Sequence, residues 1–166
     1  SISMEESYNK ALVMLNSNNP KDVKQAVNIM DSLSMNNYAP AMYELAKTYG
    51  WYSDSLLLKR KDALGIDYYN DPDHYGWPKL DKYNDKARDL YSKILELNDS
   101  TTAIIKAKAA YRMATYSANE NDTYGQNFKK AKEYLLEAKE YAIAAKDDSL
   151  LMNINNAITI IDERIK

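Results

Sequence analysis

Residues 39–52 have the sequence APAMYELAKTYGWY, which predicts one helix that ends at Gly50 and continues into Trp51 and Tyr52. The central phrase of this stretch, Tyr-x-x-Ala, recurs along the chain. It occurs at Tyr8–Ala11, Tyr43–Ala46 and Tyr111–Ala114, with a degenerate copy at Ile154–Ala157. A recurring phrase at a long, regular interval is typical of helical repeat proteins.

A second phrase alternates with the first and ends in Ala26, Ala87 or Ala131. Each of these alanines lies in an amphipathic run with helical spacing. The chain therefore alternates two helix types. Tyr8 and Tyr43 lie 35 positions apart, within a repeat period of about 35–45 residues. Between Tyr43 and Tyr111 the interval is longer, which indicates an insert at residues 51–80.

The periodicity predicts seven main helices and one short extra helix inside the insert. The expected main helices cover residues 3–17, 21–35, 39–50, 81–97, 101–118, 127–145 and roughly 149–166, and the extra one covers residues 55–64. Asn19, Asp54 and Asp147 are the expected N-caps. Gly50 is expected in the left-handed conformation that closes many helices.

Composition also favours helices over sheet. The chain has only four glycines, four prolines and three valines, whereas sandwiches and barrels use many turns and β-branched residues. The recurring alanines predict positions where helices approach closely, because a small side chain lets neighbouring backbones come together. We therefore expect a single all-α domain over residues 1–166, with the aromatic-rich insert at residues 51–80.

Residues 22–26 and 41–50 carry a family resemblance. They resemble the Sel-one-like repeats, relatives of the tetratricopeptide repeats, in which an alanine-bearing helix leads into a helix reading roughly Ala-x-x-x-Leu-Gly-x-x-Tyr-x-x-Gly. Ala46 stands where that family usually has its first glycine, and the family's glycine-rich connector is replaced by the insert. The resemblance implies a right-handed α-α superhelix that binds proteins or peptides.

Several function classes find no support in the sequence. A net charge of −2 gives no electrostatic footprint for nucleic acid, and we interpret Lys59-Arg60-Lys61 as a solvated helix face. The absence of cysteine excludes thiolate zinc sites and thiol nucleophiles. No apolar run approaches the length of a membrane span. The sequence shows no signal peptide. The compartment stays open, with a cytoplasmic location favoured and an exported form as the alternative if a signal segment has been removed.

The only histidine, His74, lies in a segment without a nucleophile motif or the ligand spacing of a standard metal site. We therefore predict no enzymatic activity, no cofactor and no metal. The preferred hypothesis is a scaffold or adaptor for a protein or peptide partner. Two alternatives stay open: a structural or regulatory module of a larger protein, and a small-ligand binder that uses the aromatic insert.

The insert holds the candidate binding residues. They are Trp51, Tyr52, His74, Tyr75 and Trp77, which include both tryptophans of the chain. In one interpretation the rings fold back and cover a side of the helical stack. In the other, Tyr68 and Tyr69 pack inward while residues 75–77 form a contact surface, for which Trp and Tyr are favoured residues.

Overall fold

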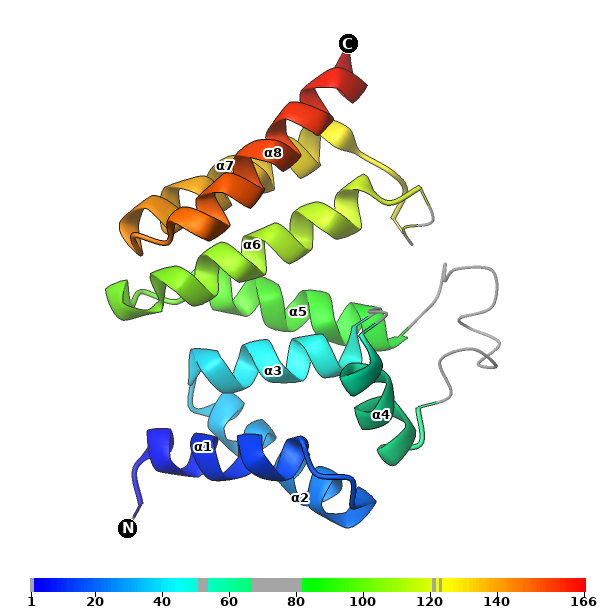
Figure 1. The fold of residues 1–166 in the computed structure, drawn as a ribbon, viewed down its shortest axis with the longest axis vertical. Helices are drawn as coiled ribbons and strands as arrows, with labels where there is room; N and C mark the ends of the chain where they lie inside the picture. Colours follow the sequence, from blue (N-terminus) through cyan, green and yellow to red (C-terminus); the bar gives the residue numbers. More distant parts are fainter. Residues whose placement is uncertain (1, 51–53, 67–81, 121, 123) are drawn as a thin grey trace. The chain divides into compact units, whose positions relative to one another are not determined.

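The computed structural model describes residues 2–50, 54–66, 82–120, 122 and 124–166 of the 166-residue chain. All regular elements within these ranges are helical (Figure 1). They comprise eight α-helices and one short 3-10 helix in the part of the chain that the structure describes. The prediction of an all-α protein is therefore confirmed.

The α-helices follow the predicted segments with shifts of a few residues at their ends. Their bounds are α1 Met4–Leu15, α2 Pro20–Met35, α3 Ala39–Tyr49, α4 Ser55–Ala63, α5 Lys82–Glu96, α6 Ala103–Ala118, α7 Phe128–Ala144 and α8 Asp148–Ile165, with the 3-10 helix η1 at Ser100–Thr102. Helix α4 is the short extra helix expected within the insert.

Side-chain caps explain where several helices begin. The carboxylate of Asp54 accepts a hydrogen bond from the Leu56 amide at 2.8 Å, and Asp147 accepts one from the Leu150 amide at 3.0 Å. Asn19 caps α2 in the same way, with Pro20 in the first turn. The three predicted N-caps are confirmed, and each satisfies an amide that lacks a partner within its helix.

The predicted conformation of Gly50 is wrong. Its φ is −71° and its ψ is 168°, so the chain leaves α3 in an extended direction. After helix ends the left-handed conformation occurs instead at Asn37, Gly65 and Lys146, with φ of 59°, 74° and 57°. These residues directly follow helices that end in tight turns, where a left-handed residue reverses the chain.

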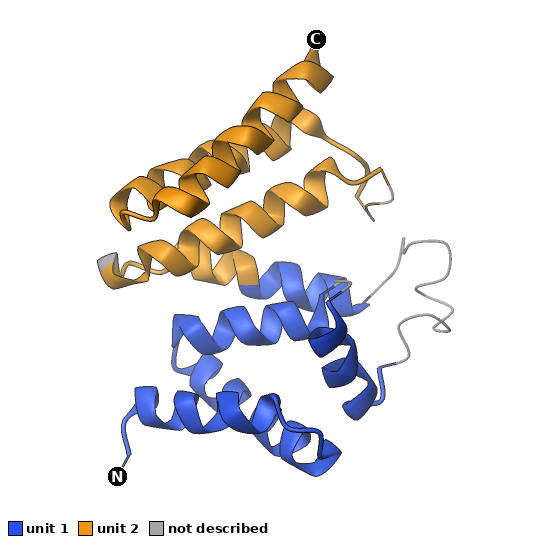
Figure 2. Ribbon diagram, in the orientation of Figure 1, with its two compact units in different colours: residues 1–75, 82–90 blue, residues 76–81, 91–166 orange. Residues whose placement is uncertain are grey.

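The chain divides into two compact units (Figure 2). Unit 1 comprises residues 1–75 and 82–90, and unit 2 comprises residues 76–81 and 91–166, so the boundary falls within α5. In unit 1, α2 packs on α1 and α3, and α4 packs on α2 and α3. In unit 2, α7 packs on α6 and α8. A single domain over the whole chain stays a prediction.

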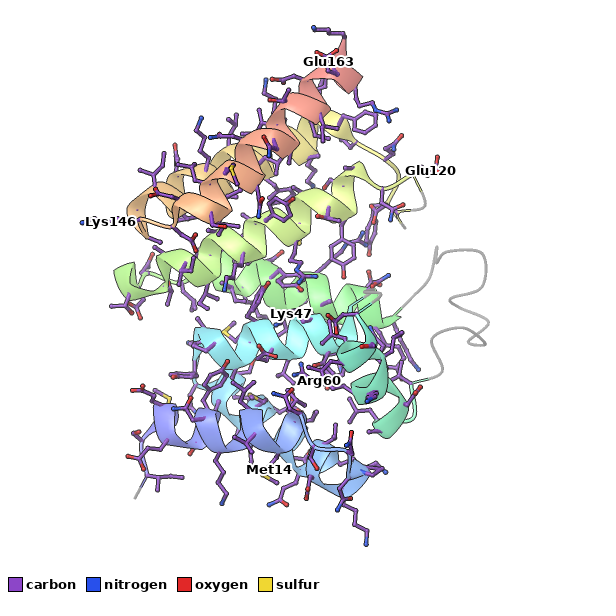
Figure 3. All side chains as sticks on the ribbon, viewed as in Figure 1. Met14, Lys47, Arg60, Glu120, Lys146 and Glu163 are labelled. Atoms are coloured by element: carbon purple, nitrogen blue, oxygen red, sulfur yellow. The ribbon has the colours of Figure 1, made fainter. Side chains whose placement is uncertain are left out.

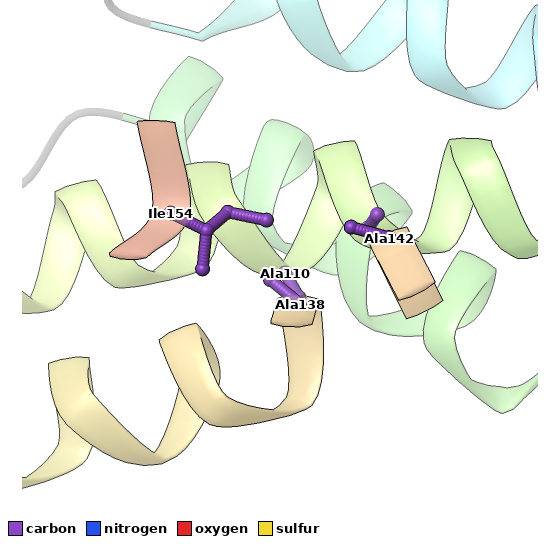
Figure 4. Close-up of a cluster of buried hydrophobic side chains, with 5 residues drawn as sticks. Ala110, Ala138, Ala142 and Ile154 are labelled. Atoms are coloured by element: carbon purple, nitrogen blue, oxygen red, sulfur yellow. The ribbon is translucent and has the colours of Figure 1, made fainter. Parts of the chain in front are cut away.

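The recurring alanines lie in the core, as their spacing predicted. Their exposed fractions range from 0% to 3%, for Ala11, Ala26, Ala46, Ala87, Ala114 and Ala131. On α2 the apolar residues at helical spacing, Val23, Ala26, Val27, Met30 and Leu33, are all buried. In unit 2 the alanines continue as a cluster of Ala107, Ala110, Ala138 and Ala142, with Ile154 from α8 (Figure 4). Small side chains on both α6 and α7 allow these two helices to pack closely.

Candidate functional site

The predicted binding residues lie outside the part of the chain that the structure describes. This applies to Trp51, Tyr52, His74, Tyr75 and Trp77, and to Tyr68 and Tyr69. Their roles therefore stay predictions. The structure does describe α3 and α5, the helices on either side of the insert, together with α4 inside it, and residues of these helices take part in two clusters in unit 1.

The first cluster is a buried ion pair between α3 and α4. One terminal nitrogen of Arg60, Nη1, lies 3.0 Å from Oε2 of Glu44, and the other, Nη2, donates to Oδ1 of Asn16 at 2.5 Å. Arg60 is 3% exposed and Glu44 is 9% exposed. This cluster, called here the Glu44–Arg60 cluster, joins the end of α1 to α3 and α4 (Figure 3 labels Arg60 and Lys47).

Glu44 has a second cationic partner, because Nζ of Lys47 lies 3.0 Å from its Oε1. The carboxylate is thus held between two positive charges, an arrangement that offsets the cost of removing it from water. Within the described residues, Nε of Arg60 is buried without a hydrogen-bond partner. One donor of the guanidinium group is therefore unsatisfied, and the burial of that nitrogen opposes folding.

Lys61 secures α4 at a second point. Its exposed fraction is 1%, and its amine donates a hydrogen bond to the backbone carbonyl of Gly50 at the end of α3. The C-terminal end of a helix carries partial negative charge, which favours a cation there. The interpretation of residues 59–61 as a solvated face is therefore wrong for Arg60 and Lys61, and holds only for Lys59, which is exposed.

The sequence around Glu44 could have indicated that this carboxylate is buried and paired. Helix α3 carries apolar residues on every side, including Met42, Tyr43 and Leu45, so the helix is buried all round. A carboxylate in such a helix needs a buried partner. That reasoning points to a cation for Glu44, although it does not identify Arg60.

Tyr8 borders the Glu44–Arg60 cluster. Its ring centroid lies 5.6 Å from that of Tyr38, with the planes tilted by 55°. The pKa of Tyr8 is raised to about 12, chiefly by burial and also by the Glu44 carboxylate and Tyr38, while Arg60 acts in the opposite direction. The phenol therefore stays protonated at neutral pH.

The second cluster joins the helices on either side of the insert. Tyr49, the last residue of α3, stacks on Tyr83 near the start of α5, with ring centroids 6.3 Å apart and planes 13° apart. The amine of Lys86 lies 4.3 Å from the Tyr49 ring centroid, and that of Lys82 lies 5.1 Å from the Tyr83 ring centroid. This group is called here the Tyr49–Tyr83 cluster.

The surroundings of Tyr49 favour its neutral phenol. The pKa of Tyr49 is raised to about 12, chiefly by burial and then by the charges of Asp31 and Tyr83. Asp31 itself has a pKa raised by burial, which the charge of Lys86 partly counteracts. The cluster thus combines flat aromatic rings with two exposed amines, a combination suited to non-covalent recognition.

Both raised tyrosine pKa values predict a loss of stability at alkaline pH. A phenol whose pKa is about 12 when folded and 10.0 when unfolded binds its proton more tightly in the native state. The stability from this difference is complete below pH 10 and is lost as the pH rises toward 12. Urea unfolding at about pH 9 and about pH 11 measures the loss. The Tyr8→Phe/Tyr49→Phe variant should lose less stability than the parent.

The matched control for this experiment is Tyr124→Phe, because Tyr124 is 72% exposed. It should show the same decline with pH as the parent, including the part that comes from lysine titration. If the Tyr8→Phe/Tyr49→Phe variant declines as steeply as the Tyr124→Phe variant, the two phenols are not protected in the native state.

Neither cluster contains histidine or cysteine. Within the described ranges, no three His, Cys, Asp or Glu side chains gather in a way that could hold a metal ion. No described helix combines the length and apolar character needed to cross a bilayer. The chemistry that the two clusters offer is positioning and non-covalent contact: charged groups fix α4, and stacked rings fix the ends of the insert.

Comparison with family models, curated proteins and solved structures finds no match to this chain.

Proposed function

We propose that this protein is a non-enzymatic scaffold that binds a protein or peptide through helical repeats of the Sel-one-like type. The observation that carries the proposal is the burial of the alanines at the recurring positions. Three of these alanines are the last residue of a Tyr-x-x-Ala phrase, and the other three lie in the helices that alternate with it. All six are at most 3% exposed. Equivalent burial at equivalent positions is what a repeat architecture requires.

The packing within each unit supports this proposal. Helices α1, α2 and α3 pack in sequence order in unit 1, and α6, α7 and α8 do so in unit 2. The connections after α1, α2 and α7 are short, as in repeats made of helical hairpins. We propose that successive pairs follow the right-handed superhelix of the Sel-one-like family. Such proteins use their extended surfaces for binding.

We place the binding surface on the aromatic insert. The Tyr49–Tyr83 cluster joins the helices from which the insert departs and to which it returns. Arg60 and Lys61 hold α4 against α3 within the insert. A surface supported in this way loses less conformational entropy on binding than a free loop. Trp51, Tyr52, His74, Tyr75 and Trp77 are the residues proposed to contact the partner.

Selection from a random peptide display library tests the proposal, because such a library samples many candidate partner sequences at once. Peptides selected on the intact protein are expected to bind a Tyr75→Ala/Trp77→Ala variant at least about tenfold more weakly, since aromatic hot spots contribute about 2 kcal/mol or more each. Binding is measured by isothermal titration calorimetry.

The control variant for this test is Tyr124→Ala, which removes an aromatic side chain that is 72% exposed and lies far from the insert in the sequence. It should bind the selected peptides as the parent does. Peptides that bind the insert variant with unchanged affinity would rule out the insert as the binding surface. A library that yields no specific binder would contradict the scaffold function.

A further inference from the structure

Helix α7 carries an exposed apolar strip with one lysine in it. Leu136 and Ile143 are 46% and 55% exposed. Lys139 lies between them, three residues after Leu136 and four before Ile143. Positions three and four apart lie on the same side of a helix, so the three side chains are neighbours. They are called here the α7 stripe.

The charge of Lys139 has no acidic partner on its own helix. Lys139 is partly buried, and among the described residues no carboxylate is paired with its amine. The positions three and four residues away on either side hold Leu135, Leu136, Ala142 and Ile143. Glu137 and Glu140 are two residues and one residue away, at positions that do not face Lys139.

The neighbouring helix α8 does not supply a carboxylate either. Helices α7 and α8 pack together, and the amine of Lys132 lies 2.6 Å from a carboxylate oxygen of Asp162. Seven residues further along α7 and seven residues back along α8, the same antiparallel register places Lys139 opposite Asn155. Residues 149–161 contain no Asp, Glu, Lys or Arg. The position that would complete a second ion pair between α7 and α8 is therefore an amide.

Apolar and acidic side chains border Lys139 in a definite order. The register places residue 151 opposite Ile143, and the next residue, Met152, is 60% exposed. Glu133 and Glu140 are exposed on α7, three residues before and four after Leu136. The unpaired positive charge thus lies among apolar side chains, and negative charges lie along the edge of the stripe on α7.

We propose that the α7 stripe binds an amphipathic helix of another protein that carries one Glu or Asp within its apolar face. The carboxylate pairs with Lys139, and the apolar side chains pack on Leu136, Ile143 and Met152. A helix suits a stripe with spacings of three, four and seven residues, because its own side chains repeat at the same intervals.

The charges determine which occupant fits. A wholly apolar helix would cover the Lys139 amine without a partner, which is costly. An anionic membrane surface would meet the exposed carboxylates of Glu133 and Glu140. Only an occupant with a central acid satisfies the lysine and avoids both costs. This surface is separate from the aromatic insert, and the inference does not depend on binding there.

A display library of helix-constrained peptides, randomised on one face, tests the proposal. The library is first depleted on a Leu136→Glu/Ile143→Glu variant and then selected on the intact protein, so that peptides specific for this surface remain. The selected peptides are expected to carry Glu or Asp in the randomised face. Fluorescence anisotropy should show that they bind Lys139→Gln at least about tenfold more weakly, because the acid then loses its partner. Lys130→Gln, on another side of α7 and also exposed, is the matched control and should bind as the parent does.

Asn155→Asp separates loss of binding from loss of folding. The new carboxylate competes for Lys139, so this variant should bind the peptides at least about tenfold more weakly while its thermal unfolding shows no loss of stability. A depleted library that yields no binder overturns the proposal, as do binders without an acidic residue or binders indifferent to Lys139→Gln. The Tyr75→Ala/Trp77→Ala variant should bind these peptides as the parent does. A loss of binding in that variant would place the peptides on the insert and would also overturn the proposal.

Discussion

Replacing Arg60 with alanine is expected to lower the free energy of unfolding by about 3–5 kcal/mol, the range observed when one partner of a buried ion pair is removed. Arg60 is 3% exposed, and its loss leaves Glu44 with Lys47 as its remaining cation. Asn16 loses the donor that Arg60 provides at 2.5 Å. The link that Arg60 makes from α4 to Asn16 and Glu44 is removed at the same time, while that of Lys61 to Gly50 stays.

Urea unfolding followed by circular dichroism measures this change, with Lys59→Ala as the matched control. Lys59 is the preceding residue on the same helix and is exposed, so its removal should change stability by no more than about 0.5 kcal/mol. Adding Glu44→Gln to Arg60→Ala should restore part of the loss, because it removes the carboxylate that lacks its main partner. If Arg60→Ala and Lys59→Ala unfold at the same urea concentration, the ion pair is not buried in solution.

Most of the helical core could be predicted because its pattern is local. Positions such as Val23, Ala26 and Met30 follow the 3.6-residue period, and one helix face is enough to place them. The recurring alanines add a second constraint, since a close helix contact tolerates few other side chains. These features do not depend on how distant segments meet.

The buried polar contacts could not be predicted because they depend on the path of the chain. Arg60 pairs with Glu44 and Asn16, which precede it by 16 and 44 residues. These contacts depend on how α4 packs on the neighbouring helices. The helical period of α4 alone does not predict that packing. A run of three basic residues is usually solvated, so the local pattern favoured the wrong environment.

Unit 2 also contains a buried basic residue that the local sequence does not predict. Lys106 is 9% exposed, and its amine donates to the backbone carbonyl of Leu97, just beyond the end of α5. The amine also lies 5.5 Å from the ring centroid of Tyr141. Lys61 and Lys106 thus both use a long apolar stem to reach a carbonyl at or just beyond a helix end. This role of a lysine among alanines is not evident from the local sequence.

The candidate site also has one part that the local sequence predicts and another that depends on the tertiary fold. The density of aromatic residues in the insert follows directly from the sequence. The stacking of Tyr49 on Tyr83 joins residues separated by the entire insert, so it depends on the tertiary fold. The structure therefore adds the contact between the two helices that flank the insert. The binding roles of Trp51 and Trp77 stay predictions.

Replacing Ile154 with alanine is expected to cost about 4 kcal/mol, toward the upper part of the range for such truncations. Ile154 is fully buried, and the other fully buried residues of its cluster are Ala107, Ala110, Ala138 and Ala142, with larger side chains such as Ile158 only partly buried at its edge. The alanine side chains cannot extend into the space that the lost methyl and methylene groups leave, so only the larger side chains at the edge of the cluster can move toward it. The cavity should therefore persist, and the cost of a truncation rises with the cavity that remains.

Thermal and urea unfolding of Ile154→Ala, Ile154→Val and Ile143→Ala separate this effect from the general cost of losing an isoleucine. Ile143 on α7 is 55% exposed, so its truncation should change stability by no more than about 0.5 kcal/mol. Ile154→Val removes one methylene and should cost about 1 kcal/mol. Equal stability of Ile154→Ala and Ile143→Ala would mean that α8 does not close this core in solution. The graded loss expected here would instead show that the fourth helix of the tyrosine–alanine series, where isoleucine replaces tyrosine, is anchored by that isoleucine.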